Sequence, residues 1–373
     1  MLRIDRRLLQ NFDWITLAVA ILICLVGIMT IYSATRPLSD EPHLSFYLKQ
    51  ILWLALGLFA LLLVAWVDYI WIERSSRILY IGGIFLLVAV FFLGRTGMGA
   101  QRWLSIGPVS FQPSEFFKTV YIIMLAHYLS ILKSPLDAGS LLRVFFFLTL
   151  FPFILLVKQP DLGTALIILM IFLSLIIARG LHKKVAVLVI LLSLISLPFL
   201  GNIFWEGLRD YQKSRLVAFI EPETDPTGVG YQLNQSKITV GSGMFLGKGY
   251  LHGTQGPFRF LPEKHTDFVF AIFAEEWGFL GSSILMLLYL ILILRGLDTA
   301  QKAKDDFGRL LALGITFMFL MYLFINIGMT LGLMPVVGIP LPFISYGGTA
   351  LLSNLIAVGI LINIRTHRFE LFH

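Results

Sequence analysis

Ten apolar segments run through the chain, and they constrain its fold more than any other feature. A helix needs roughly 17 to 25 apolar residues to cross a hydrocarbon core about 30 Å thick. With 57% hydrophobic and only 14% charged residues, the chain carries more apolar surface than a soluble domain can bury. We therefore predict an all-α polytopic membrane protein, a single integral membrane domain over residues 1–373. Its expected transmembrane helices lie near residues 14–34, 46–67, 78–93, 114–132, 143–158, 161–179, 185–205, 267–295, 309–333 and 345–364.

The basic residues predict how these helices are oriented. If the N-terminus is inside, the short inner loops carry more Lys and Arg than the short outer ones, which is the usual bias of cytoplasmic loops. Both termini are then cytoplasmic, and the one long loop, about residues 206–266, is extracytoplasmic. The net charge of +7 is scattered over short clusters without a continuous stripe, so we do not expect nucleic-acid binding.

The first polar cluster on the outer side contains Arg102 and Trp103, followed by Glu115 and Lys118 at the start of a span. Ionisable residues at membrane depth are costly, so each needs a partner or a function. Glu115 and Lys118 are three residues apart and lie on neighbouring faces of one helical turn. The spacing leaves two interpretations equally open: a structural ion pair with Ser114 as the helix cap, or part of a substrate site.

A second outer position is Asp161, which follows a proline and precedes an apolar segment. An acid in this place is a good N-terminal cap, and capping alone accounts for it. A functional role for Asp161 depends on neighbours from elsewhere in the chain.

The third position, Asp267, lies where the long polar loop enters an apolar helix. Acids favour helix N-termini, so capping competes with catalysis, although Thr266 can also cap. Arg259, Lys264 and His265 crowd the same edge. A carboxylate that is half out of water among such groups can be tuned for general-base chemistry.

Three further ionisable residues flank this helix entry. Lys248, between two glycines, is positioned to approach a phosphate together with backbone N–H groups, although the signal is weak. Glu275 and Glu276 lie about 12 Å deeper, at 1.5 Å rise per residue. We expect them to pair with polar groups of neighbouring elements, and a proton relay is the alternative.

The stretch 334–348 contains three prolines and three glycines, so it cannot continue a straight helix. We predict a broken, re-entrant segment before the last helix, which is tolerated only where it is buried in protein or lines a cavity. It either shapes a groove for a lipid tail or forms an architectural turn. The sequence has no Cys/His metal-ligand spacing, nucleophile elbow or nucleotide-binding motif.

Six motifs, in order along the chain, carry a resemblance to a known family. The chain resembles the SEDS family of cell-wall polymerases, and one of the motifs, GKGYLHGTQ, favours its elongation members over its division members. The motifs are GAQRW at 99–103, QPSEFFK at 112–118, QPDLGT at 159–164, GKGYLHGTQ at 247–255, FLPEKHTDFVFA at 260–271 and PVVGIPLPFISYGG at 335–348.

The resemblance implies a ten-helix glycosyltransferase of the bacterial cytoplasmic (inner) membrane. Such an enzyme polymerises lipid II into glycan strands during cell elongation and rod-shape maintenance, beside a class B penicillin-binding protein. It also implies that Asp267 is the catalytic residue. Polar residues of the matching motifs then become candidates for activity, namely Arg102, Trp103, Glu115, Lys118 and Asp161.

We therefore expect Asp267 to deprotonate a sugar hydroxyl that displaces a lipid pyrophosphate and inverts the anomeric carbon. The pyrophosphate requires cations. We expect these to be the basic residues Arg102, Lys118, Lys248, Arg259 and Lys264, together with a divalent ion such as Mg²⁺ or Mn²⁺, and we expect no organic cofactor. The alternatives are a flippase for the lipid-linked precursor and a non-catalytic scaffold for the penicillin-binding protein. The expected substrate-binding residues are Arg102, Trp103, Glu115, Lys118, Asp161, Lys248, Arg259, Lys264 and His265.

Overall fold

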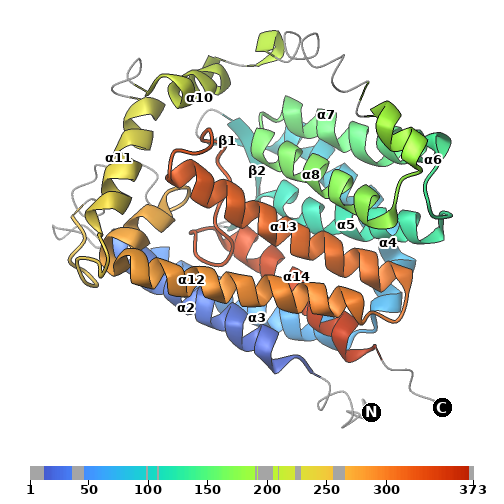
Figure 1. The fold of residues 1–373 in the computed structure, drawn as a ribbon, viewed down its shortest axis with the longest axis horizontal. Coiled ribbons are helices and arrows are strands. Elements are labelled where there is room, and N and C mark those ends of the chain that lie inside the picture. Colours follow the sequence, from blue (N-terminus) through green and yellow to red (C-terminus); the bar gives the residue numbers. More distant parts are fainter. Residues whose placement is uncertain are drawn as a thin grey trace.

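A bundle of roughly parallel helices forms the body of the protein (Figure 1). The computed structural model describes residues 12–35, 46–97, 100–106, 109–189, 191, 205–208, 210–222, 228–254 and 265–368. Its long helices are α2 (Trp14–Thr35), α3 (Phe46–Trp66), α4 (Tyr69–Leu93), α5 (Pro113–Ile131), α8 (Leu162–Arg179), α12 (Val269–Gln301), α13 (Asp306–Thr330) and α14 (Gly348–Thr366). Between α5 and α8, the chain forms α6 (Ala138–Arg143), a π-helical stretch η1 (Val144–Leu150) and α7 (Phe151–Lys158). The predicted all-α class is confirmed.

Eight helical segments in the described part of the chain are long and apolar enough to cross a membrane. They are the long helices above without α5, plus the continuous stretch Ala138–Lys158. The predicted span near 114–132 is present as α5, but polar residues such as Glu115 and Lys118 make it less apolar than the others. Most of the seventh predicted span, near 185–205, lies outside the described residues. The protein is therefore a multi-pass membrane protein, as predicted.

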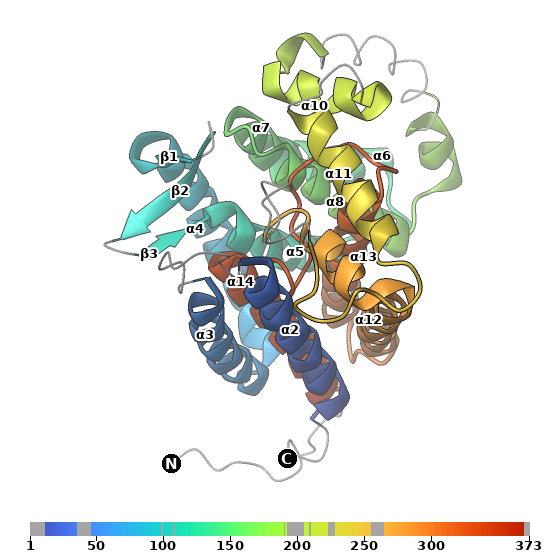
Figure 2. The ribbon, with the colours of Figure 1, turned by 90° about the vertical axis from the view of Figure 1, so that its left-hand side faces the viewer.

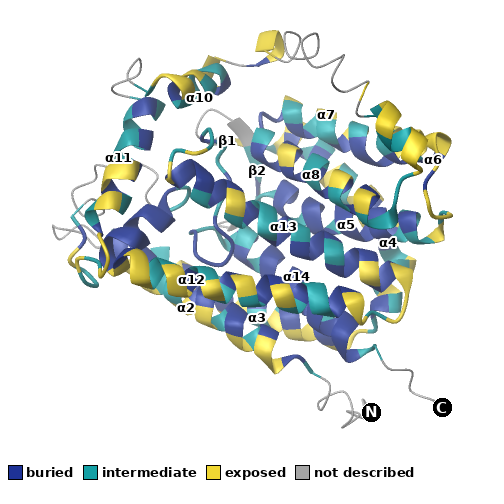
Figure 3. Ribbon diagram, in the orientation of Figure 1, coloured by how far each residue is buried: buried dark blue, intermediate teal, exposed yellow. Residues whose placement is uncertain are grey.

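The centre and the periphery of the bundle differ in burial. α13 and α14 are the most buried of the eight membrane-spanning segments, whereas α3 and α4 are among the least buried. Figure 3 shows exposed residues along the outward faces of the peripheral helices. Apolar side chains such as Phe85 and Phe92 of α4 lie on such a face, as expected for a surface in contact with lipid.

A charge network joins three helices at one end of the bundle. Asp13, directly before α2, forms a salt bridge of 2.5 Å with Arg295 of α12. Arg365 of α14 lies 3.5 Å from Asp13 and 2.6 Å from Asp298. The start of the first described span and the end of the last one therefore lie on the same side, as an even number of crossings requires.

The opposite end of the bundle carries the polar segments. There the described part of the long loop includes the helices α10 (Asp210–Ile220) and α11 (Val229–Ser242), and α11 lies across the ends of the long helices (Figures 1 and 2). A small antiparallel sheet, not predicted from the sequence, lies at this end too. Its strands are β1 (Arg95–Gly97), β2 (Ala100–Ile106) and β3 (Val109–Phe111), in the order β1-β2-β3.

α12 is kinked at Gly278, which has a positive φ of 64°. The segment after α11 compensates for the interrupted hydrogen bonds, because the N–H groups of Phe279 and Leu280 bond to the carbonyls of Met244 and Phe245 at 2.9 and 3.0 Å. A Cβ atom on Gly278 would lie 2.3 Å from the backbone nitrogen of Gly247. Only a glycine fits this close approach of two backbones.

Candidate active site

The backbone that carries Asp267 is fixed by hydrogen bonds to three consecutive main-chain carbonyls. The His265 carbonyl accepts a hydrogen bond from the Tyr346 N–H at 2.8 Å. The Thr266 carbonyl accepts one from Ser345 Oγ at 2.7 Å, and the Asp267 carbonyl accepts one from Asn326 Nδ2 at 3.0 Å. The start of α12 is therefore held by α13 and by the segment that precedes α14.

That segment is the broken stretch predicted at 334–348. It forms no helix until Gly348, and its apolar residues Ile339, Leu341 and Phe343 are buried. Side chains serve as partners for two of its backbone groups: Leu341 N donates to Ser345 Oγ at 2.8 Å, and Ile339 O accepts from Asn326 Nδ2 of α13 at 2.8 Å. Irregular backbone at membrane depth requires such partners.

Asn326 joins the two parts of this framework, because its amide donates to both Asp267 O and Ile339 O while its side chain is fully buried. We expect Asn326→Leu to lower the apparent Tm and to slow turnover, since each buried carbonyl left unsatisfied costs about 1–3 kcal/mol. Thermal unfolding and product formation measure the two effects. Thr316→Val is the control, because that hydroxyl donates within its own helix, to Ala312 O. Wild-type turnover in Asn326→Leu would show that the amide does not position Asp267.

The Asp267 side chain is half-buried and lies beside an arginine of the long loop. A Cβ atom built on Gly338 would lie 3.5 Å from Asp267 Oδ2 and 3.4 Å from Arg215 Nη1. Arg215 belongs to α10, so the loop brings a cation to the carboxylate across the broken segment. Arg215 is not among the residues predicted from the sequence.

Arg102 reaches the same end of the bundle from β2. Its Nη2 donates to the Pro160 carbonyl and lies 3.4 Å from the Tyr211 hydroxyl. Tyr211 of α10 also donates to Pro160 O, at 3.0 Å. Trp103 is the next residue on the strand, where it pairs with Arg95. Successive side chains of a strand point to opposite faces, so Trp103 does not share the direction of Arg102.

Asp161 caps α8, with Oδ1 accepting from Thr164 N at 3.3 Å. Its other oxygen accepts from Gln112 Nε2 at 3.1 Å and from Ser114 Oγ at 2.8 Å. The side chain is buried. Asp161 thus joins the starts of α5 and α8, and its predicted contact with substrate stays a prediction.

Glu115 and Lys118 form an ion pair of 2.7 Å, with 7% and 3% of their side chains exposed. The Lys118 ammonium also lies 4.7 Å from the centre of the Tyr322 ring. Of the two interpretations left open by the spacing, this geometry is that of a buried structural pair. The Ser114 cap predicted with it is wrong, because Gln112 occupies the N-cap position of α5 and Ser114 Oγ donates to Asp161. A direct contact with substrate stays a prediction for both residues.

Lys248 is paired as well, because its Nζ donates to Glu275 Oε1 at 2.6 Å. Thr254 gives the same oxygen two hydrogen bonds, from N at 2.9 Å and from Oγ1 at 2.8 Å. Glu276 accepts a hydrogen bond from Ser33 of α2. Both glutamates therefore join neighbouring elements, in agreement with the structural role expected for them, while the predicted phosphate contact of Lys248 stays a prediction.

Of the three remaining candidates, only His265 lies in the described part of the chain. The centre of the His265 ring lies 4.9 Å from that of Phe46 and 5.8 Å from that of Tyr346. Arg259 and Lys264 lie outside the described residues, so their predicted roles stay predictions.

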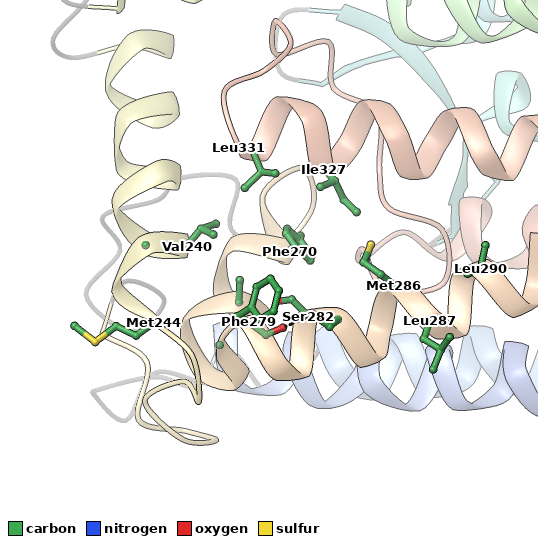
Figure 4. A pocket seen from close by; sticks show the side chains of 14 residues that line it. Val240, Met244, Phe270, Phe279, Ser282, Met286, Leu287, Leu290, Ile327 and Leu331 are labelled. Atoms are coloured by element: carbon green, nitrogen blue, oxygen red, sulfur yellow. Dashed lines mark hydrogen bonds between the residues drawn. The ribbon is translucent and has the colours of Figure 1, made fainter.

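An apolar pocket of about 640 Å³ lies beside this site, between α11, α12 and α13. Figure 4 shows Val240 of α11, Phe270 and Met286 of α12, and Ile327 of α13 around it. Ile327 follows Asn326 directly, so the pocket adjoins the framework of Asp267. Its described lining contains no ionisable side chain, and this pocket therefore suits an apolar group rather than the reacting atoms.

Three residues central to this geometry were missed. Asn326 is an amide inside the apolar sequence LFINIGM, and the cost of a polar group at that depth was an available signal. Tyr211 and Arg215 are four residues apart, which places them on one face of a helix. Nothing in the sequence, however, indicates that this face meets Asp267.

Comparison with known proteins gives concordant results. The family model for FtsW/RodA/SpoVE, described as cell cycle protein, matches residues 12–370. The peptidoglycan glycosyltransferase MrdB of Escherichia coli K12 is 42% identical over 318 residues, which is 84% of each chain. The peptidoglycan glycosyltransferase RodA of Treponema pallidum is 33% identical, with 96% of this chain and 98% of that protein covered.

Solved structures are similar over nearly the whole chain. The crystal structure of the Thermus thermophilus rod shape determining protein RodA superimposes with a TM-score of 0.70 at 27% identity, covering 96% of this chain and 98% of that one. A second structure, described as the structural coordination of polymerization and crosslinking by a peptidoglycan synthase complex, gives a TM-score of 0.81. It is 30% identical and covers 96% of this chain and 99% of that one.

Proposed function

Because the chain belongs to the FtsW/RodA/SpoVE family and is a peptidoglycan glycosyltransferase, we propose that it polymerises lipid II with Asp267 as the general base. The observation that carries this proposal is the Asp267 carboxylate, half-buried at the start of α12 on a backbone fixed by α13 and the broken segment. Preorganisation of this kind is what a catalytic base requires.

The proposed reaction is a direct displacement. A sugar hydroxyl of one lipid-linked disaccharide loses its proton to Asp267, and its oxygen bonds to the anomeric carbon of the growing chain. The bond from that carbon to the pyrophosphate oxygen breaks, and the electron pair leaves with the lipid pyrophosphate. One displacement inverts the anomeric centre and needs no nucleophile on the protein.

The predicted divalent cation, Mg²⁺ or Mn²⁺, is also a proposal. No group of three His, Cys, Asp or Glu residues gathers in the described part of the chain. Mg²⁺, however, commonly binds through one or two carboxylates together with substrate phosphates, and Asp267 is a suitable carboxylate. Bound there, the cation would neutralise charge on the pyrophosphate. Undiminished polymerisation in excess EDTA would exclude it.

We also propose the cellular setting. One structural neighbour comes from a peptidoglycan synthase complex that coordinates polymerization and crosslinking, which supports a class B penicillin-binding protein as partner. The excess of Lys and Arg in the short loops predicted to be inner supports cytoplasmic termini in the bacterial inner membrane.

The test is polymerisation by the purified full-length protein in proteoliposomes with its transpeptidase partner. Lipid II is supplied only to the outer leaflet, and the products are separated on a gel. Long glycan strands are expected. A preparation that is correctly folded yet leaves lipid II as monomers would contradict the proposal.

A further inference from the structure

The cations expected to hold the pyrophosphate are not equally available. Lys118 and Lys248 each lie within 2.7 Å of a carboxylate, Glu115 and Glu275 respectively, and both carboxylates are buried. Taking either lysine for substrate would leave a buried carboxylate without its cation, which is strongly unfavourable. The anion must therefore find other positive charges near Asp267.

Two guanidinium groups meet this requirement, and they are tied to one tyrosine. Arg215 lies above the Tyr211 ring, with Cζ 5.8 Å from its centre. Arg102 lies at the other end of that side chain, with Nη2 3.4 Å from the Tyr211 hydroxyl. The Tyr211 hydroxyl is itself fixed by donating to Pro160 O at 3.0 Å. We name Arg102, Tyr211 and Arg215 the Arg-Tyr-Arg cluster.

This cluster lies next to the proposed base and remains accessible. Arg215 Nη1 and Asp267 Oδ2 approach the same point above Gly338, at 3.4 and 3.5 Å. Arg102, Arg215 and Asp267 are each partly exposed, and Tyr211 is 36% exposed. Even with Asp267 ionised, the two guanidinium groups leave a net positive charge at this place.

We infer that Arg215 and Arg102 form the binding site for the pyrophosphate of the lipid-linked substrate, an inference that rests on the proposed function. Guanidinium groups present planar pairs of N–H donors that match phosphate oxygens. Arg215 also connects pyrophosphate binding with deprotonation of the sugar hydroxyl, because it belongs to the loop helix α10 and lies beside Asp267. The long loop thereby contributes a binding residue, Arg215, to a site that otherwise lies at the ends of the transmembrane helices.

Direct binding tests the inference without requiring turnover. Farnesyl pyrophosphate is the probe, and farnesol, which lacks the phosphates, is its control. Binding to purified full-length protein is measured by microscale thermophoresis for wild type, Arg215→Gln, Arg102→Gln and Arg215→Lys. Lys213→Gln is the matched control, because Lys213 lies on the same helix over the Trp205 ring. Thermal unfolding of each variant establishes that it is folded.

We expect wild type to bind the pyrophosphate and not farnesol. Arg215→Gln and Arg102→Gln should each lose about 10- to 100-fold in affinity, because each removes a hydrogen bond to a charged group. Arg215→Lys should lose less, and Lys213→Gln should bind as wild type does. Equal affinity in wild type and folded Arg215→Gln, or no binding by wild type, would overturn the inference. Wild type that binds the probe but forms no glycan would instead count against the proposed function.

Discussion

Asp267→Asn is expected to lower the rate of glycan polymerisation by about 10²- to 10⁴-fold, the usual contribution of a general base. The asparagine amide cannot accept the proton of the attacking hydroxyl. The hydrogen bond that fixes this residue uses its main-chain carbonyl and comes from Asn326, so the backbone contact survives the substitution. The rate is measured by gel analysis of strands made from lipid II, alone and with the transpeptidase partner.

Asp210→Asn provides the control for Asp267→Asn. Asp210 is an exposed acid at the start of α10, at the same end of the bundle, and its substitution should leave the rate unchanged. If a correctly folded Asp267→Asn protein polymerises near the wild-type rate, Asp267 is not the base.

Lys118→Met should have the largest effect on stability. It leaves Glu115 without its cation at a position where only 7% of that side chain is exposed. Breaking a buried pair by removing one partner typically costs about 3–5 kcal/mol, whereas replacing both partners with apolar or neutral groups is often near neutral. The double substitution Glu115→Gln with Lys118→Met should therefore be more stable than Lys118→Met alone.

The apparent Tm in detergent measures this difference between the single and double variants. A Lys118→Met protein that unfolds at the wild-type temperature would contradict the structural interpretation. Polymerisation by the double variant answers a separate question. Recovered stability without recovered activity would support the substrate-binding role predicted for Glu115 and Lys118.

The fold could be predicted because a hydrocarbon environment leaves few choices for the backbone. Apolar segments of sufficient length must form helices there, and the helices follow those segments. The prediction was least accurate for α4, which begins at Tyr69 and not near 78. Asp68 caps that helix by accepting from Ile70 N, but Glu73, Arg74 and Arg77 in its first turns lower the local hydropathy.

The candidate site could be predicted only in part, because its contacts join segments far apart in the chain. Asp267 could be identified because it lies where the polar loop enters an apolar helix. Arg215 lies beside it only in the folded protein, where α10 approaches the broken segment at Gly338. Likewise, the sequence does not show that Lys118 and Lys248 form ion pairs with Glu115 and Glu275. Sequence patterns identify polar residues at membrane depth, whereas the partner of each depends on packing.

The main-chain carbonyls of residues 265–267 are fixed by hydrogen bonds, and this affects which residues can change during evolution. The contacts that hold these carbonyls use main-chain atoms of the loop, so they place few demands on side-chain identity there. The framework and the chemistry can therefore change separately during evolution. A descendant could acquire a different reactive group at position 267 while the helices around it kept their sequences.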